Sequence, residues 1–284
     1  MIATACDAVR AGRPIGVFDS GVGGLSILRA LRAEMPQEHF VYVADSGHSP
    51  YGERDEAHVI ARSRAITTQL RSTYAIKALV IACNTATAAA VHLLRAAHPD
   101  LPIIGVEPAL KPAVELTRTG RIGVMATRGT LGSAKFTALL ASLGGVAEFI
   151  LQPGDGLADA IERQETTKII ALCDQYTLAM GQFGLKPGQI DKLVLGCTHY
   201  PFASEYLRAL LGPDIQFIDT GEPVARHTRQ LLMARHIPLQ NADAPTVSCK
   251  PTGHLTLVST GAPAALKAAA QRWLGLAVPV HATH

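Results

Sequence analysis

A repeated pairing of an apolar segment with a cysteine constrains this chain more than any other feature. The segment LVIACNT carries Cys83, and the related segment LVLGCTH carries Cys197, 114 residues later. Upstream, residues 15–20 (IGVFDS) and residues 122–127 (IGVMAT) form a second related pair, 107 residues apart. Because both pairs repeat at similar offsets, the chain is predicted to contain two related halves, each about the size of a small domain.

Short apolar segments alternate with helix-like stretches over most of the chain. This order is typical of a parallel sheet with crossover helices. The segments are rich in Val, Ile and Leu without polar alternation, as strands buried on both faces require. The pattern predicts an α/β fold with strands at residues 15–19, 40–44, 78–83, 103–106, 122–125, 149–151, 193–197, 215–219 and 255–258.

The same repeat sets the expected domain boundaries. A chain of 284 residues is long enough for two ordinary domains. The second repeat is exhausted by about residue 219, so the last segment is expected to complete the first half. We therefore predict a first domain of residues 1–108, completed by residues 220–284, and a second domain of residues 109–219.

Composition and charge exclude several classes of protein. The chain is 48% hydrophobic and 17% charged, which is typical of a globular protein with a substantial core. Its net charge of +3 and the lack of a Lys/Arg cluster argue against a nucleic-acid partner. No apolar run is long enough to cross a bilayer, and residues 1–13 have no signal-peptide core, so no membrane partner is expected. Five scattered cysteines argue against a disulfide framework and favour a reducing cytoplasm.

Polar groups and thiols are expected to gather at the carboxyl edges of the predicted sheets. Ligands of open parallel sheets bind outside the carboxyl ends of the strands. Helices begin there, and their free N–H groups attract carboxylates and favour thiolates. These edges therefore suit a substrate that carries a carboxylate. The residues at or just beyond the carboxyl ends of the predicted strands are Asp19, Ser20, Cys83, Asn84, Thr85, Thr127, Cys197, Thr198 and His199.

A cysteine after a strand also has a simpler interpretation. Cysteine is one of the most buried residue types and often serves only to pack the core. We assign that role to Cys6, Cys173 and Cys249, since none of them lies in a polar partner motif. The matching surroundings of Cys83 and Cys197 favour chemistry instead.

Asp19 and His199 likewise allow other interpretations. With the two cysteines, His199 would provide three zinc ligands, but the closely spaced Cys pairs of structural zinc sites are missing, so no metal is expected. Asp19 and Ser20 stand before glycines and could cap the next helix, or Asp19 could pair with a substrate ammonium or tune a thiol. The glycine run has neither the G-x-G-x-x-G spacing nor a GK[ST] ending, so a nucleotide cofactor is not favoured.

Four motifs in order resemble glutamate racemases, which belong to the cofactor-independent aspartate/glutamate racemase superfamily. They are DSGVGGL at residues 19–25, SPYG at residues 49–52, ACNTA at residues 82–86 and LGCTHYP at residues 195–201. The match runs from about residue 14 to at least residue 232. The resemblance implies two pseudosymmetric α/β domains, each a parallel sheet flanked by helices, with the active site between them. It implies no pyridoxal phosphate, no metal and no other cofactor.

The resemblance also implies roles for individual residues. Cys83 and Cys197 would be the two catalytic thiols, and Asp19 and His199 would manage protons beside them. The implied substrate-binding residues are Asp19, Ser20, Pro50, Tyr51, Gly52, Asn84, Thr85, Thr127, Thr130, Thr198 and His199.

One segment departs from the family pattern. Family members often carry a Glu in a C-P-x-x-x-x-L-V-E segment that supports the thiol of the second half. Here residues 152–162 read QPGDGLADAIE. Asp159 is taken as the closest match to the supporting acid, and hence as a catalytic residue, with Glu162 as the alternative.

The resulting hypothesis is a two-base racemisation of glutamate. One cysteine, as thiolate, would remove the α-proton, and the other, as thiol, would donate a proton to the opposite face. The resemblance implies that the product D-glutamate serves peptidoglycan synthesis, and so cell-wall biogenesis and cell shape. Related enzymes are commonly dimers, which makes a homodimer a candidate assembly.

Other functions remain open at the level of sequence. An aspartate racemase, another amino-acid racemase, a maleate isomerase or an arylmalonate decarboxylase of the same superfamily would use a related thiol site. A thiol hydrolase would need only one Cys–His pair. A non-catalytic amino-acid-binding module would have little reason to retain both thiols.

Overall fold

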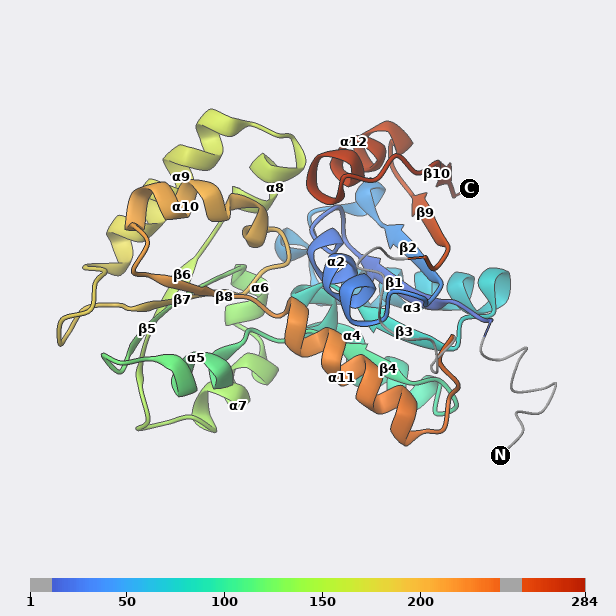
Figure 1. Ribbon diagram of the computed structural model, residues 1–284, viewed down its shortest axis with the longest axis horizontal. Coiled ribbons are helices and arrows are strands. Elements are labelled where there is room, and N and C mark those ends of the chain that lie inside the picture. Colours follow the sequence, from blue (N-terminus) through green and yellow to red (C-terminus); the bar gives the residue numbers. More distant parts are fainter. Residues whose placement is uncertain (1–11, 241–251, 284) are drawn as a thin grey trace. The chain divides into compact units, whose positions relative to one another are not determined.

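The chain divides into two compact units, each described by itself. The computed structural model describes residues 12–240 and 252–283, with the elements labelled in Figure 1. Unit 1 takes in the described parts of Met1–Ser49, Asp55–Val106 and Gly221–His284. Unit 2 takes in Pro50–Arg54 and Glu107–Thr220.

The short segment Pro50–Arg54 groups differently from expectation. The sequence analysis places it in the first domain, but it belongs to unit 2. The reason is packing, because its 3-10 helix η2 (Tyr51–Glu53) contacts α6 (Arg128–Leu131). A Cβ atom built on Gly52 would lie 3.2 Å from the Cβ atom of Thr127, so the two loops are in close contact.

Unit 1 is built on a six-stranded sheet in the order β10-β9-β2-β1-β3-β4, in which every neighbouring pair is parallel. Strands β1, β2 and β3 are buried along their whole length. Their unbroken apolar sequence is explained by helices on both faces of the sheet. The strands are β1 (Ile15–Asp19), β2 (Phe40–Ala44), β3 (Ala78–Ile81), β4 (Ile103–Gly105), β9 (Leu255–Ser259) and β10 (Val280–Ala282).

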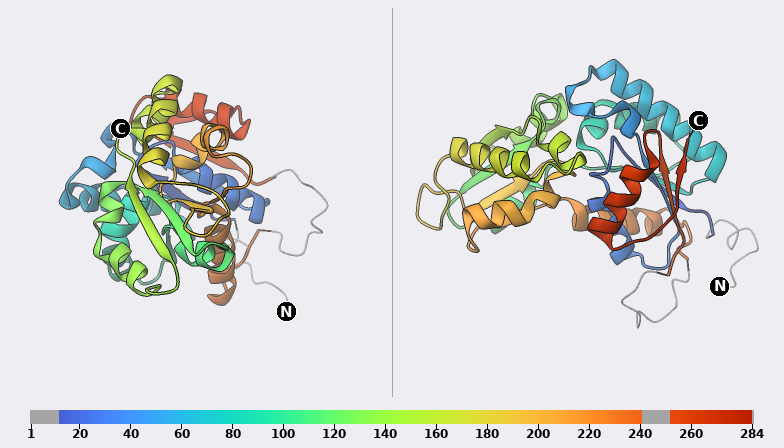
Figure 2. Two further views of the ribbon diagram at one scale, coloured as in Figure 1. Left: turned by 90° about the vertical axis from the view of Figure 1, so that its left-hand side faces the viewer. Right: turned by 90° about the horizontal axis from the view of Figure 1, so that it is seen from above.

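The helices of unit 1 form two groups on opposite faces of this sheet, as the right panel of Figure 2 shows. Helix α2 packs against α11 and α12, and α3 packs against α4. Right-handed crossovers require this division, because the connection from β1 to β2 crosses the sheet in the opposite direction to the next two connections. The helices are α2 (Leu25–Glu34), α3 (Glu56–Tyr74), α4 (Asn84–Ala97), α11 (Gly221–Ala234) and α12 (Pro263–Leu274).

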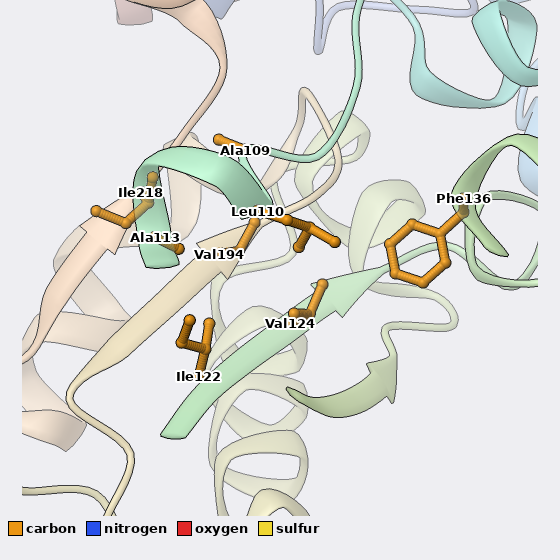
Figure 3. Packing of buried hydrophobic residues seen from close by; sticks show 8 residues of the cluster. All are labelled: Ala109, Leu110, Ala113, Ile122, Val124, Phe136, Val194 and Ile218. Atoms are coloured by element: carbon orange, nitrogen blue, oxygen red, sulfur yellow. The ribbon is translucent and has the colours of Figure 1, made fainter. Parts of the chain in front are cut away.

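Unit 2 is built on a four-stranded parallel sheet in the order β6-β5-β7-β8. Apolar side chains of α5 and α7 pack on one face of it, where Leu110 and Phe136 meet Val124 (Figure 3). Helices α8, α9 and α10 pack together, and α9 contacts β6. The strands are β5 (Arg121–Ala126), β6 (Glu148–Pro153), β7 (Lys192–Leu195) and β8 (Gln216–Ile218). The helices are α5 (Leu110–Leu116), α6, α7 (Ala134–Ala141), α8 (Leu157–Glu162), α9 (Thr166–Met180) and α10 (Ser204–Leu211).

The two sheets share one topology. The order β2-β1-β3-β4 in unit 1 has the same pattern as β6-β5-β7-β8 in unit 2, so β1 corresponds to β5 and β3 corresponds to β7. The cysteine segments follow β3 and β7, and the IGV segments lie in β1 and β5. The predicted pair of pseudosymmetric α/β halves is therefore confirmed. The repeat in the sequence corresponds to strands in equivalent places of the two sheets.

All nine predicted strands are present; β1 and β2 have the predicted ends, and the other seven differ by one or two residues. The strands predicted at residues 78–83 and 193–197 end at Ile81 and Leu195, because the chain turns away before each cysteine. Strand β10 was not predicted. It has only three residues, none of them buried, so it carries no apolar signal.

The helices are amphipathic rather than apolar all round. Helix α3 has 19 residues and buries Val59, Ile66 and Leu70, while Arg64 on another side of the helix is exposed. Within residues 12–240 and 252–283, no helix is both long enough and apolar enough to span a membrane.

The buried carboxylate of Asp191, which precedes β7, binds the segment that precedes β5 and so fixes the starts of these two central strands of unit 2. Asp191 is fully buried and accepts hydrogen bonds from Thr117 Oγ1 at 2.6 Å, Arg118 N at 2.8 Å and Thr119 Oγ1 at 3.0 Å. Lys192 Nζ lies 2.8 Å from the same carboxylate. Burial acts to raise the pKa of Asp191, but these hydrogen bonds outweigh it and lower the pKa to about 2.

We predict that Asp191→Asn destabilises the protein in a pH-dependent way. The carboxylate has a lower pKa in the folded chain than in the unfolded chain, where it is about 3.9, so its contribution is complete above that pH and is lost as the pH falls towards 2. At neutral pH the variant should lose about 2 kcal/mol of unfolding free energy. Urea denaturation over a pH series measures the difference in unfolding free energy between the wild type and the variant. This difference should become smaller in acid. The exposed Asp214→Asn is the control, and an equal loss in both variants would contradict the prediction.

Candidate functional site

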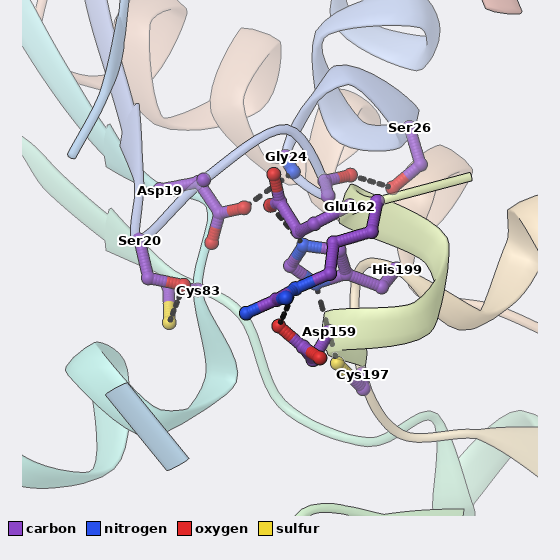
Figure 4. A network of polar contacts seen from close by, with 12 residues as sticks. Asp19, Ser20, Gly24, Ser26, Cys83, Asp159, Glu162, Cys197 and His199 are labelled. Carbon is purple, nitrogen blue, oxygen red and sulfur yellow. Dashed lines mark hydrogen bonds and ion pairs between the residues drawn. The ribbon is translucent and has the colours of Figure 1, made fainter. Parts of the chain in front are cut away.

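Each unit carries one cysteine directly after its third strand, and Figure 4 draws the polar contacts around both. In unit 1 the backbone pairing continues one residue beyond β3, because Ala82 N donates to Phe18 O at 2.7 Å. In unit 2 Gly196 N donates to Met125 O at 2.8 Å in the same way. The chain then turns into a helical segment, so Cys83 and Cys197 occupy equivalent places in the two units.

In unit 1, Cys83 is the N-cap residue of α4. Its Sγ atom accepts a hydrogen bond from Ala86 N at 3.4 Å and lies 3.9 Å from Ser20 Oγ. The side chain is buried except for 5% of its surface. The free N–H groups and the dipole of a helix N-terminus favour the thiolate form of a cysteine. The sulfur atom is therefore set up to carry negative charge.

Asp19 ends β1 and is fully buried beside this cysteine loop. Its Oδ2 atom accepts a hydrogen bond from Gly24 N at 2.7 Å, and Tyr42 Oη supports the same loop by donating to Gly21 O at 2.6 Å. A Cβ atom on Gly24 would lie only 2.7 Å from the Cβ atom of Asp19, so only glycine fits here. The helix-capping interpretation of Asp19 is thus partly correct, since the carboxylate binds the residue that precedes α2.

The other predicted residues of this region lie at the starts of short helical segments. Asn84 and Thr85 begin α4, and Asn84 is 5% exposed. Tyr51 is 1% exposed and begins η2, which Pro50 precedes. The residues Pro50, Tyr51 and Gly52 group with unit 2, whereas Asn84 and Thr85 belong to unit 1.

In unit 2, Cys197 is the first member of a chain of three polar side chains. Its Sγ atom lies 3.7 Å from His199 Nδ1, and His199 Nε2 lies 2.6 Å from Glu162 Oε1 (Figure 4). Burial acts to lower the pKa of His199, but hydrogen bonds and negative charge at Cys197 and Glu162 outweigh it, so the pKa is raised well above the usual value. A charged imidazolium beside the sulfur favours negative charge on Cys197.

The acid that contacts His199 is Glu162. Asp159, which the sequence analysis preferred, lies 2.9 Å from Arg163 Nε and 3.6 Å from Lys168 Nζ, and no contact joins it to the thiol or to His199. Both acids lie on α8, but they contact different partners. With the Pro of the family motif on Pro153, its final Glu falls on Ala160, between the two acids, so the spacing alone does not choose between them.

The remaining predicted residues of unit 2 are Thr127, Thr130 and Thr198. Thr127 caps α6, and its Oγ1 atom accepts from Thr130 N at 3.2 Å and donates to Thr130 Oγ1 at 2.9 Å. Thr130 is 2% exposed. Thr198 lies between Cys197 and His199 and is 4% exposed. All of them follow β5 or β7, at the carboxyl edge of the sheet.

Cys173 is the third cysteine within the described residues. Cys173 is fully buried in α9, and burial raises its pKa to about 12, so it stays a neutral packing residue. Cys6 and Cys249, which were also interpreted as packing residues, lie outside the described residues. Across the described ranges, no group of three or more His, Cys, Asp and Glu side chains is placed to hold a metal ion.

The repeated fold, with one cysteine after the third strand of each unit, defines a class of protein. A family profile identifies the same class. The profile described as Asp/Glu/Hydantoin racemase matches residues 25–228. Because this match spans well over half of the sequence, the chain belongs to the Asp/Glu/Hydantoin racemase family. The resemblance indicated by the four motifs is confirmed.

Several relatives of the chain are glutamate racemases. The chain is 48% identical over 237 residues to the glutamate racemase of Ralstonia nicotianae, covering 83% of each chain. It matches the structure of a glutamate racemase isoform from Bacillus anthracis with a TM-score of 0.81 and 30% identity, over 96% of this chain and 98% of that one. It matches Escherichia coli glutamate racemase, in complex with L-glutamate and the activator UDP-MurNAc-ala, with a TM-score of 0.77 and 29% identity, over 95% and 98% of the two chains.

We predict that Glu162→Gln lowers the pKa of His199. The substitution keeps the shape of the side chain and removes its negative charge, so the imidazolium loses a partner that stabilises it. NMR titration of the His199 ring measures the change. Asp159→Asn is the matched control on the same helix and should leave the pKa of His199 as it is. If Asp159→Asn lowers the pKa of His199 and Glu162→Gln does not, the acid that stabilises the imidazolium is Asp159 and not Glu162.

Proposed function

We propose that this chain is a glutamate racemase that works by two-base proton transfer between Cys83 and Cys197. One cysteine, as thiolate, takes the α-proton, and the other, as thiol, delivers a proton to the opposite face of the same carbon. The observation that carries the proposal is the equivalent placement of the two cysteines, each directly after the third strand of a unit with the same topology. The family membership and the relatives near 48% identity support the reaction and the substrate.

Glutamate suits the residue types that surround the two thiols. Its carboxylates would bind at helix N-termini and to hydroxyl and amide donors, as anions do elsewhere. The Escherichia coli relative binds L-glutamate in its structure, which supports the same substrate here. The substrate-binding residues in this proposal are Asp19, Ser20, Pro50, Tyr51, Gly52, Asn84, Thr85, Thr127, Thr130, Thr198 and His199.

The chemical difficulty of the reaction is the weak acidity of the α-carbon. A free thiol has a pKa of about 8.5, far below that of an amino-acid α-carbon, so thiolate basicity alone is too small. The site has to stabilise the negative charge that develops on the substrate, with donors fixed before the reaction and with water excluded. The low exposure of Cys83, Asn84, Cys197 and Thr198 supports such a dry environment.

The two half-sites manage the proton by different means. Beside Cys197, the His199–Glu162 pair would favour the thiolate and accept changes in charge as the proton moves. Glu162 takes the supporting role that the sequence analysis assigned to Asp159. Beside Cys83, the helix N-terminus and Ser20 would stabilise the sulfur, and Asp19 would adjust the charge nearby. Each such acid–base contribution is typically worth about 10²–10⁴ in rate.

The cellular setting of the enzyme belongs to the same proposal. The product D-glutamate would supply peptidoglycan synthesis and so cell-wall biogenesis and cell shape. A reducing cytoplasm would keep both thiols available for proton transfer. A homodimer is the proposed assembly, and size-exclusion chromatography with light scattering would measure it.

We predict that Cys83→Ala and Cys197→Ala each reduce racemisation by about 10⁴-fold or more in both directions, because either loss removes one of the two proton carriers. Polarimetry with L- and D-glutamate measures the rates, with Cys173→Ala as a control that keeps its activity. In the wild type, turnover in deuterium oxide should place deuterium on the α-carbon of the product. Substantial racemisation by either catalytic variant would exclude the two-base mechanism.

Each base can also be tested by itself with a 3-chloroglutamate. Removal of the α-proton lets chloride leave with its bonding electrons, and the resulting enamine hydrolyses to 2-oxoglutarate and ammonia, so this substrate needs only one base. We predict that each Cys→Ala variant loses elimination from one C2 epimer and keeps it for the other, with the preference reversed between the variants. If one variant loses elimination from both epimers, the cysteine that it lacks does more than remove the α-proton from one face of the carbon.

A further inference from the structure

Two buried tyrosines hold one tight turn of unit 2. Tyr200 Oη donates to the carbonyl of Gly154 at 3.0 Å, and Tyr176 Oη donates to the carbonyl of Asp155 at 2.5 Å. Tyr200 is fully buried and Tyr176 is 7% exposed. The two carbonyls are consecutive, in residues 153–156, which we call the 153–156 turn. Hydrogen bonds to consecutive carbonyls fix both the position and the orientation of this turn.

The 153–156 turn also has contacts on its other sides. Gly154 N donates to Ala126 O at 2.9 Å, which extends the pairing of β6 with β5 by one residue. The carboxylate of Asp155 lies 2.7 Å from Arg128 of α6. Gly156 has a φ of +72°, a conformation that favours glycine, and it is the N-cap residue of α8. The turn is therefore bound to β5, to α6 and to both tyrosines before it enters α8.

Gly154 leaves just enough room for the phenol. A Cβ atom at this position would lie 2.3 Å from Tyr200 Oη and 2.9 Å from its Cζ atom. No side chain can be added there unless the tyrosine moves. The phenol ring and the backbone of the turn are thus in direct contact, and neither can shift without the other.

These contacts close into a ring that includes the proposed catalytic groups. Tyr200 binds the turn, the turn begins α8, and α8 ends at Glu162. Glu162 binds His199, which directly precedes Tyr200 in the chain. Both ends of α8 are therefore fixed to the segment that carries Cys197. Small errors in placing proton-transferring groups cost large factors in rate, so such a closed arrangement has a direct consequence for catalysis.

We propose that Tyr200 and Tyr176 are positioning residues, which act through the 153–156 turn and α8 to hold Glu162 in register with His199 and Cys197. This inference rests on the proposed function. It assigns the two phenols a role confined to the Cys197 half of the reaction, since the ring contains no residue of unit 1.

The phenol of Tyr200 keeps its proton while Cys197 changes charge. Burial and negative charge at Cys197 raise the pKa of Tyr200 well above its ordinary value. The hydroxyl therefore remains a hydrogen-bond donor to Gly154 in both states of the thiol. A donor that ionised with the thiol would release the turn at the moment when Glu162 and His199 must be in place.

The test uses the two C2 epimers of 3-chloroglutamate with the full-length enzyme. The epimer whose elimination Cys197→Ala abolishes reports on the Cys197 half, and the other epimer reports on the Cys83 half. Tyr200→Phe should lower kcat for the first epimer about tenfold, as expected for the loss of one buried hydrogen bond. The second epimer should react at the wild-type rate. Tyr176→Phe should show the same selectivity, and Tyr206→Phe on α10 is the control that changes neither rate.

A second pair of variants tests the contact between Tyr200 and the turn. Gly154→Ala should lower the rate for the Cys197-dependent epimer, because the new methyl group displaces the phenol. The double variant Gly154→Ala with Tyr200→Phe should lose less than the product of the two single losses, since both changes break the same contact. Circular dichroism shows that each variant is folded.

The outcomes separate the inference from the function on which it rests. Equal loss for both epimers, or no loss for either, in folded Tyr200→Phe and Tyr176→Phe would overturn the positioning role. If the rate losses of Gly154→Ala and Tyr200→Phe multiply in the double variant, the positioning role is also overturned. If Cys197→Ala itself fails to distinguish the epimers, the two-base proposal is what fails.

Discussion

Each half-site depends on the pairing of the third strand of its unit with the first strand, which lies in the middle of the sheet. These pairs are β3 with β1 and β7 with β5. In unit 1 the hydrogen bond from Ala82 to Phe18 carries this pairing to the residue before Cys83. In unit 2 the bond from Gly196 to Met125 does the same before Cys197. Because parallel strands place all their carboxyl ends at one edge, this pairing brings each thiol to the edge where helix N-termini and polar loops gather. The two cysteines owe their placement to the backbone before any side chain contributes.

The two half-sites share this backbone but differ in their electrostatics. Cys83 depends on a helix N-terminus and on Ser20, and its surroundings hold a buried carboxylate, Asp19. Cys197 depends on His199 and Glu162, and the pKa of His199 is raised because negative charge on both sides outweighs the effect of burial. The two units thus share a topology, while the polar partners of their cysteines differ. A racemase has to act on two mirror-related substrates, so unequal half-sites are chemically reasonable provided that each cysteine can exist as thiol and thiolate.

Sequence patterns predicted the strands because burial on both faces leaves a strong apolar signal. They failed where that signal is weak or local. Strand β10 is short and solvent-exposed, and the ends of β3 and β7 depend on where the chain turns rather than on composition. The choice between Asp159 and Glu162 could not be made with certainty from their spacing, since both lie on one short helix. It depends on which carboxylate meets His199 and which meets Arg163 and Lys168.

The sequence by itself determined the duplicated α/β architecture, the two cysteines after equivalent strands and the family of the chain, since these features are written in contiguous segments with strong periodicity. Only the tertiary structure decided that Glu162 is the partner of His199, that Tyr51 and Gly52 pack with unit 2, and that Tyr176 and Tyr200 hold one turn. These contacts join residues far apart in the chain. The contacts of Glu162 and of the two tyrosines depend on how α8 and α9 pack, and those of Tyr51 and Gly52 depend on α6, and no local pattern of residues encodes that packing.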